Sequence, residues 1–312
     1  MHSNQIVPRV QGLRLSSLLD ISNVGPNRNA NLYLKARIYL RRHVPGPNET
    51  IQGVPVEPWE DRDWTRFHTR FKPVIEQGFN NKFWLIPDGF WGADHPSNEM
   101  PQRRPNIRCC LTVELAPRPE VADSIFMCVR IADGQRQNWR SNMTTNATMS
   151  AVHQFLGLSD RDGLLCQHDL DLVEMGYDRM VMSPEAQARI PEGGTVHMIV
   201  ALHEFGHFLG LDHVCGHGND REPYGVTPYQ QRSLMGRGNE VRAAHSWPWR
   251  RRLRDHLIDY RPNFRVSMTR VLPRALTQTE IDHHDFLMQQ RRMDPTRPSA
   301  GVPLPDGGVP LR

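Results

Sequence analysis

Apolar and polar positions alternate along several short stretches in the first half of the chain. Four segments have the alternation, or the apolar and β-branched composition, that predicts strands: residues 31–42, 82–86, 109–116 and 124–132. Between the first two, residues 61–78 carry apolar side chains at helical spacing, which predicts an amphipathic helix packed on a sheet. The order strand, helix, strand, strand, strand predicts an α+β fold, in which a mixed sheet has helices on one face.

The pattern is different at the two ends of the chain and after residue 190. Residues 1–30 are polar and are expected to be irregular, and the Pro- and Gly-rich residues 295–312 predict a disordered tail. The cluster Pro191–Thr195 interrupts regular structure, and Thr195 is available to cap a buried helix over the apolar residues that follow it. Residues 239–260 are basic, contain tryptophan and look helical.

Length and composition describe an ordinary globular protein. With 312 residues the chain can bury a full core, so we expect one principal domain with extra segments. No apolar run is long enough to span a bilayer, so no membrane span is expected. The net charge of +4 comes almost wholly from arginine, and the clusters at 250–252 and 291–292 lack interleaved stacking aromatics. We therefore expect a solvated surface and no nucleic-acid partner; the oligomeric state is left open.

The cysteines exclude a disulfide-rich class of protein. The chain has five, two of them adjacent, and an odd count argues against a fully paired framework. No Cys-x-x-Cys pair is present, so a cysteine-based zinc site is not expected. Cys215 lies two residues past His213, and three states stay open for it: a thiol near a metal, one half of a bridge, or a buried free thiol.

The chemistry of the chain is concentrated in residues 203–213, which read His-Glu-Phe-Gly-His-Phe-Leu-Gly-Leu-Asp-His. His203 and His207 are four residues apart, so on a helix they emerge one turn apart on the same face and can share one metal ion. Glu204 lies beside them as a candidate general base. Gly210 lets the chain leave the helix and fold back, which carries His213 to a third ligand position.

Three protein ligands leave one tetrahedral corner for water, which is typical of a catalytic zinc ion rather than a structural one. The alternative is a buried amphipathic helix whose histidines only pack or form hydrogen bonds. That alternative explains a single histidine well, but not three at these intervals with Glu204 and Gly210 between them. Structural calcium has little support: the runs 160–163 and 168–171 contain oxygen ligands, but neither has the carboxylate series of a calcium loop.

With these residues in view, the chain resembles the metzincin zinc metallopeptidases. Residues 203–213 match in full the long zinc-binding signature of that family. A second segment looks like its Met-turn: Ser233-Leu234-Met235-Gly236, in which Met235 lies 22 residues beyond His213. The specific match covers only 203–236. The resemblance implies a twisted mixed sheet backed by helices with a central zinc-binding helix. It also implies a catalytic domain over 31–294, divided into a larger subdomain of about 31–212 and a smaller one of about 213–294.

The resemblance implies a function as well. The expected activity is that of a zinc-dependent endopeptidase with a protein or peptide substrate and one catalytic Zn²⁺, held by His203, His207 and His213. A zinc-activated water attacks the peptide carbonyl, with Glu204 as general base and then general acid. Met235 is expected to form a hydrophobic floor beneath the zinc. Asp212 and nearby backbone carbonyls are candidates to orient the imidazoles.

The chain departs from the family pattern in the residues around the Met-turn. Many members carry a tyrosine two residues after the methionine, and this chain has Arg237 there. Help in the transition state would then come from Tyr224, Tyr229 or Arg237. If His213 is not a ligand, a shorter His203–His207 site with a carboxylate ligand such as Glu222 or Glu240 becomes the better interpretation. The residue after the third histidine, Val214, assigns the chain to no subfamily.

Two other functions stay open: a zinc-stabilised binding module without catalysis, and a zinc amidase acting on a non-protein peptide such as peptidoglycan. The first 22 residues lack a basic start followed by an apolar stretch, which predicts no cleavable signal peptide. The arginine-rich composition is typical of a GC-rich bacterial genome. We therefore expect secretion or delivery by a route that needs no such signal, with cytoplasmic residence as the alternative.

Overall fold

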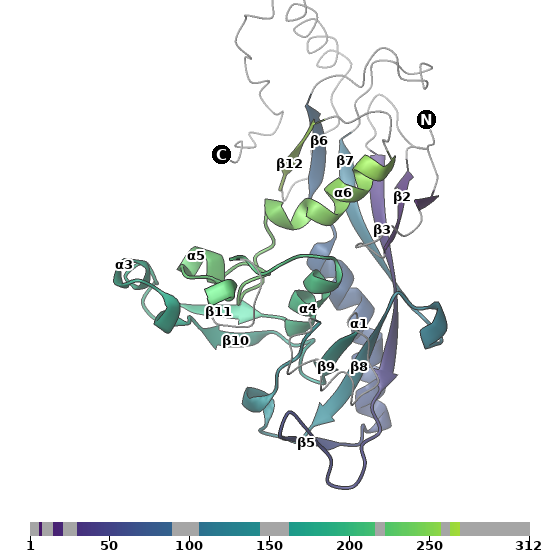
Figure 1. The fold of residues 1–312 in the computed structure, drawn as a ribbon, viewed down its shortest axis with the longest axis vertical. Coiled ribbons are helices and arrows are strands. Elements are labelled where there is room, and N and C mark those ends of the chain that lie inside the picture. The colour runs from purple at the N-terminus through teal and green to yellow at the C-terminus, as the bar shows by residue number, and fades with distance from the viewer. Residues whose placement is uncertain are drawn as a thin grey trace, which may run out of the picture.

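The computed structural model describes residues 6–7, 15–20, 30–88, 106–143, 162–215, 222–256 and 263–268. Within this part of the chain, ten strands form one twisted mixed sheet (Figure 1). Their bounds are β1 Ile6–Val7, β2 Ser16–Asp20, β3 Ala30–Arg42, β4 Thr50–Ile51, β5 Val54–Glu57, β6 Trp84–Asp88, β7 Ile107–Leu115, β8 Ser124–Ile131, β9 Gly163–Cys166 and β12 Asn263–Ser267.

Strand β3 is the centre of this sheet. One edge of β3 pairs in parallel with β7 over residues 30–38. Its neighbours on the other side are β2, antiparallel at 31–35, and then β8, parallel at 38–42. Alternate residues of β3, from Leu32 to Leu40, are buried. The strands predicted at 31–42, 82–86, 109–116 and 124–132 are confirmed as β3, β6, β7 and β8 within a few residues.

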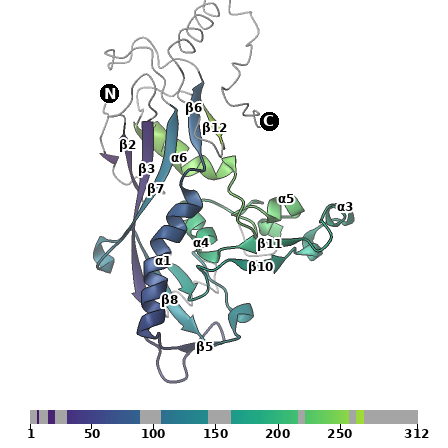
Figure 2. The ribbon, with the colours of Figure 1, turned by 180° about the vertical axis from the view of Figure 1, so that it is seen from behind.

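Helix α1 (Asp61–Phe79) confirms the helix predicted at 61–78. Its buried side chains recur every four residues and form one stripe against the sheet: Phe67, Phe71, Ile75 and Phe79. Helix α4 (Val200–Phe208) lies beside α1, as Figure 2 shows. A Cβ added at Gly78 of α1 would overlap the side chain of Leu202 in α4, so the two helices approach as closely as a glycine allows. The mixed α+β class is thereby confirmed.

Two predictions about local structure are wrong. Residues 16–20 form strand β2 rather than irregular chain, because β3 supplies a partner strand and Leu15 and Leu19 are buried against the core. Thr195 does not cap helix α4. Residues 195–198 are instead strand β11 (Thr195–Met198), which pairs antiparallel with β10 (Val173–Gly176), and α4 begins only at Val200. The apolar run that predicted one helix therefore contains a strand and the start of a helix, which periodicity alone does not separate.

The chain after His213 returns to the main sheet. Helix α6 (Trp247–His256) buries Trp249, whose indole nitrogen donates to the Cys110 carbonyl of β7 at 2.8 Å. Strand β12 then pairs antiparallel with β6. Trp249 and β12 thereby join the residues after His213 to strands β7 and β6 of the larger expected subdomain. The helix predicted at 239–260 begins only at 243, as a 3₁₀ turn that leads into α6.

The remaining short elements lie around α4. The pair β10–β11 and helix α3 (Pro184–Gln187) project from the body of the molecule, with α5 (Pro228–Gln231) beside them (Figure 1). Single 3₁₀ turns cover Pro119–Val121, Arg136–Asn138, Arg179–Val181, Glu222–Tyr224 and Ala243–Ser246. The predicted tail, 295–312, lies outside the described residues.

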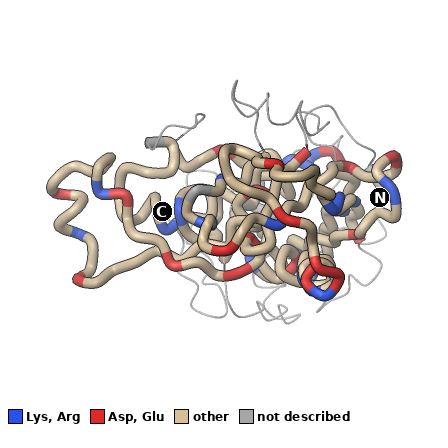
Figure 3. The backbone as a smooth tube through the Cα atoms, turned by 90° about the horizontal axis from the view of Figure 1, so that it is seen from below, with Lys and Arg blue, Asp and Glu red and all other residues tan. Residues whose placement is uncertain are grey.

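Basic and acidic positions are interspersed along the described backbone (Figure 3). No helix in the described ranges combines the length and apolar character needed to cross a bilayer.

Candidate metal centre

The three predicted histidines come together at one point beside α4. His207 Nε2 lies 3.2 Å from His203 Nε2 and 3.1 Å from His213 Nε2. His203 and His213 are buried and His207 is half-buried. Among the described residues, these three are the one group of histidine, cysteine or acidic side chains placed to hold a metal ion.

Backbone carbonyls decide which ring nitrogens face that point. His203 Nδ1 donates to the Leu234 carbonyl and His207 Nδ1 donates to the Leu211 carbonyl, each at 2.8 Å. With the proton on Nδ1, each Nε2 presents a lone pair toward the common centre. Orientation by backbone carbonyls was one of the two expected possibilities, and Asp212, the other candidate, is exposed.

The spacing of the nitrogens fits a tetrahedral metal ion. Zn–N bonds of about 2.0–2.1 Å at a tetrahedral angle place two ligand nitrogens about 3.3 Å apart, close to the two distances found here. Neutral imidazole is the ligand form, and burial is the main factor that favours it. Burial lowers the pKa of His207 to about 4 and that of His203 well below its ordinary value, with the neighbouring histidines adding to both shifts.

Gly210 produces the chain reversal that the sequence predicts. Its φ of +84° is in the left-handed region, where glycine is favoured. The Gly210 N–H donates to the His207 carbonyl and the Leu211 N–H to the Gly206 carbonyl, which closes the end of α4. Residue 213 follows three residues later, so one short turn is enough to return the third imidazole to the helix.

Met235 packs against helix α4. Its side chain is buried, and a Cβ added at Gly206 of α4 would overlap its sulfur. The same turn supplies two backbone contacts: the Leu234 carbonyl accepts from His203, and the Met235 carbonyl accepts from the Val214 N–H at 3.2 Å. The turn at 233–236 therefore contacts both His203 of α4 and Val214, the residue after His213.

Glu204 is buried beside the histidines and is 6% exposed. Burial, together with the negative charge of Asp169, raises the pKa of its carboxyl to about 8. The backbone N–H of Met143 donates to the carboxylate and opposes that rise. The segment that carries Met143 therefore lies against Glu204.

Asp169 joins several parts of this region, and its importance was not recognised from the sequence. Its carboxylate accepts from the Cys166 N–H at 2.7 Å and from the Ser141 hydroxyl, and it pairs with Arg136 at 3.0 Å. Its backbone carbonyl accepts from Ala201 in the first turn of α4 at 3.0 Å. Asp169 therefore connects α4 with the segment that contacts Glu204.

Of the three residues considered for help in the transition state, Tyr224 is the one that lies beside the histidines. The centre of its ring lies 4.1 Å from that of His213 and 5.7 Å from that of His203. Burial raises the pKa of its phenol to about 12, and the charge of Glu204 adds to this rise. The other two candidates are engaged elsewhere: Tyr229 is exposed and stacks under Arg242, and Arg237 pairs with Asp178 at 3.1 Å.

Three other residues considered for a metal site have a described environment. Glu240 pairs with Arg232 and Arg242. All five cysteines lie in described parts of the chain and are free thiols; Cys215 is exposed, so neither the bridge nor the buried thiol considered for it is found. Asp171, in the second candidate calcium run, pairs with Arg70 at 2.8 Å.

A scan against models of protein families, a search of curated proteins and a search of solved structures each find no match to this chain. Function is therefore inferred from the side chains of the metal centre and their geometry.

Proposed function

We propose that this protein is a zinc-dependent endopeptidase whose centre is formed by His203, His207, His213 and Glu204. One observation supports the proposal most strongly: the Nε2 atoms of His203 and His213 both lie within 3.2 Å of His207 Nε2, while backbone carbonyls hold the Nδ1 protons of His203 and His207 on the far side of their rings. Lone pairs so close together repel one another unless a cation lies between them. Three nitrogen ligands at this spacing suit zinc, and they leave one position for water or substrate.

When bound, zinc supplies Lewis-acid chemistry, because it lowers the pKa of a water molecule toward neutrality and polarises a peptide carbonyl. Glu204 has no role in holding the ion and is free to act as a base. A nearby divalent charge favours the ionised carboxylate and so counteracts the burial that raises the Glu204 pKa. Glu204 then accepts a proton from the attacking water and returns it to the departing amine.

The remaining side chains position the reacting groups. The Met143 N–H holds the Glu204 carboxylate in one orientation. Tyr224, which stays protonated because its pKa is about 12, can donate a hydrogen bond to the oxygen on which negative charge develops. A catalytic metal site that acts on a peptide is favoured over a purely structural metal site. The reason is that a buried carboxylate beside three ligands is costly to maintain without a chemical role.

The test measures metal content and proteolysis of a casein-type substrate on the same purified samples. Glu204→Gln keeps the size of the side chain and removes the base, so we expect about one zinc per chain, as in the wild type, with most hydrolysis lost. The matched control is Glu185→Gln in the exposed helix α3, which should keep both properties.

Each other outcome has a distinct meaning. Full cleavage by Glu204→Gln would refute the assigned base. Zinc in every sample without cleavage of protein or muropeptide substrates would favour a zinc-stabilised binding module. Cleavage of muropeptides alone would favour an amidase. Absence of zinc from the wild type would reject the proposed metal.

A further inference from the structure

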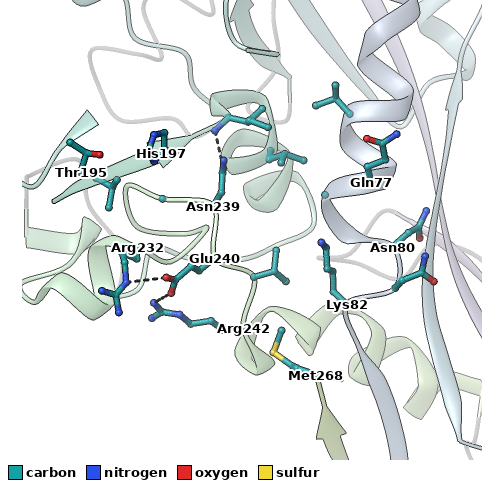
Figure 4. Close-up of a pocket in the computed structure, with 18 residues that line it drawn as sticks. Gln77, Asn80, Lys82, Thr195, His197, Arg232, Asn239, Glu240, Arg242 and Met268 are labelled. Carbon is teal, nitrogen blue, oxygen red and sulfur yellow. Dashed lines mark hydrogen bonds and ion pairs between the residues drawn. The ribbon is translucent and has the colours of Figure 1, made fainter. Parts of the chain in front are cut away.

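A second cavity lies away from the metal centre. It has a volume of about 1180 Å³ and is bounded by the end of α1, by β11 and the start of α4, by the loop at 238–242, and by Met268 (Figure 4). Its volume is sufficient for a small organic ligand.

The cavity lies beside the start of α4. Ile199 and Leu202 contribute to its lining, and the metal-centre residues do not. Successive helix residues are about 100° apart, so Leu202 and Glu204 project in nearly opposite directions. A ligand could therefore occupy this cavity without entering the metal centre.

Much of the cavity wall is apolar. Its apolar side chains come from four separate parts of the chain: Val74 of α1; Val196, Ile199 and Leu202 of β11 and the start of α4; Val241; and Met268. Such a surface favours the body of a ligand that has a hydrocarbon portion, since removal of apolar area from water is favourable.

The charged side chains of the cavity are unequally engaged. Glu240 pairs with Arg232 Nε at 2.9 Å and with Arg242 Nη2 at 2.6 Å, and Figure 4 shows this group on one wall. Arg242 also stacks over the Tyr229 ring at 3.5 Å. Lys82 lies across the cavity from them, half-buried, and its side chain extends into the space (Figure 4). Within the described ranges, Lys82 forms no ion pair.

We propose that this cavity binds an apolar carboxylic acid, with its hydrocarbon body on the Val74, Leu202 and Val241 wall and its carboxylate on Lys82. A single free ammonium group matches a monoanion. A phosphate dianion is disfavoured because the two guanidinium groups that could bind it in bidentate fashion are already held by Glu240. The proposal goes beyond the peptidase function and does not depend on it.

The test is calorimetric titration of the purified full chain with decanoate, which carries both required features. We expect saturable binding of one decanoate per chain, and much weaker binding of acetate or inorganic phosphate. Lys82→Met keeps the length of the side chain and removes the charge, so decanoate affinity should fall at least about tenfold. Lys82→Arg should retain most of it.

Two further variants locate the ligand. Lys72→Met, on an exposed part of α1 where Lys72 lies 3.8 Å from Glu76, should bind decanoate as the wild type does. Val241→Trp should fill the cavity and abolish binding, with circular dichroism confirming that the variant is folded. The proposal is overturned if the wild type shows no saturable binding, if Lys82→Met binds decanoate as tightly as the wild type, or if phosphate binds more tightly than decanoate. None of these measurements uses proteolysis or zinc.

Discussion

At the residue scale, the metal centre depends on where two protons are held. The Nδ1 hydrogen bonds of His203 and His207 leave both Nε2 atoms as acceptors, and these acceptors lie 3.2 Å apart. Neither Nε2 atom carries a proton that it could donate to the other. The two lone pairs therefore repel each other unless a cation lies between them. Hydrogen bonds to backbone carbonyls therefore orient the two rings so that their Nε2 atoms could hold a metal ion.

Substitution of His213 tests whether the third histidine is a ligand. His213→Ala should weaken zinc binding by about a hundredfold or more, since loss of a direct ligand costs at least as much as loss of an orienting partner. His197→Ala, at an exposed histidine of β11, is the matched control. Zinc affinity measured by competition with a chelator gives the result. Unchanged affinity in His213→Ala would remove His213 from the site and restore the shorter motif with a carboxylate ligand.

Tyr224 is expected to affect the reaction without affecting the metal. Tyr224→Phe keeps the ring that packs on His213 and removes only the hydroxyl, so zinc content should stay at the wild-type level. Loss of one hydrogen-bond donor to a developing oxyanion lowers kcat by about 100- to 1000-fold. The control is Tyr229→Phe, at the exposed ring beneath Arg242. A kcat for Tyr224→Phe equal to that of the wild type would assign Tyr224 a packing role only.

At the scale of elements, the site depends on close contact between α4 and the turn at 233–236. Gly206 is the point of contact, because a Cβ there would overlap the sulfur of the buried Met235. Two effects of Gly206→Ala have opposite signs. Alanine is favoured over glycine within a helix by about 1 kcal/mol, whereas overpacking of a filled core costs about 1–3 kcal/mol.

We expect the steric effect to prevail in Gly206→Ala, because Met235 is 1% exposed and has no space into which it can move. The free energy of unfolding should fall, and zinc affinity should fall with it, since the turn also carries the Leu234 carbonyl that orients His203. Gly176→Ala in β10 is the control, because nothing lies within 4 Å of a Cβ added there. A stabilised Gly206→Ala variant with unchanged zinc affinity would contradict this account.

At the scale of the whole molecule, distant parts of the chain converge on one core. Arg252 of α6 is fully buried, donates to the Leu15 carbonyl and pairs with Asp255 at 3.2 Å. Helices α1, α4 and α6 contribute to the same hydrophobic cluster. Helix α4 is therefore supported by elements from both ends of the described chain, and its stability depends on groups far from the three histidines.

His245 makes this dependence measurable through pH. Its Nδ1 accepts from the Arg242 N–H at 2.9 Å, and its Nε2 lies 3.2 Å from the Ser233 hydroxyl, so the folded protein holds it neutral. Burial lowers its pKa from the ordinary 6.5 to about 4, and the charge of Arg242 contributes. Between these values the unfolded chain binds a proton that the folded chain does not, so stability is complete above about pH 6.5 and falls as the pH drops toward 4.

The expected loss attributable to His245 is on the order of 3 kcal/mol over that range. Urea unfolding of the zinc-free protein at pH 7 and pH 4.5 measures it. His245→Gln should show a smaller difference between the two pH values than the wild type, and His197→Gln, at an exposed position, should show the same difference as the wild type. An undiminished difference in His245→Gln would assign the acid sensitivity to other groups.

Much of the centre and of the sheet could be predicted because the signals are local. Eleven residues contain all three histidines, Glu204 and the reversing glycine, and helix geometry with one left-handed residue is enough to bring them together. The four main strands and α1 repeat with periods of two and four, which reflect a buried face in each element. Short elements gave weaker signals: β2 and β11 become strands only because partner strands lie beside them.

The sequence by itself therefore determined the histidine cluster that could hold a metal ion, the place of Glu204 beside it and the principal secondary structure. Only the tertiary structure decided which groups surround them. The packing of distant segments placed Tyr224, rather than Tyr229 or Arg237, beside the histidines, placed Met143 against Glu204, and buried Asp169 next to α4. The physical reason is that helix and strand periodicity follow from neighbouring residues, whereas these contacts join segments whose meeting depends on the whole core.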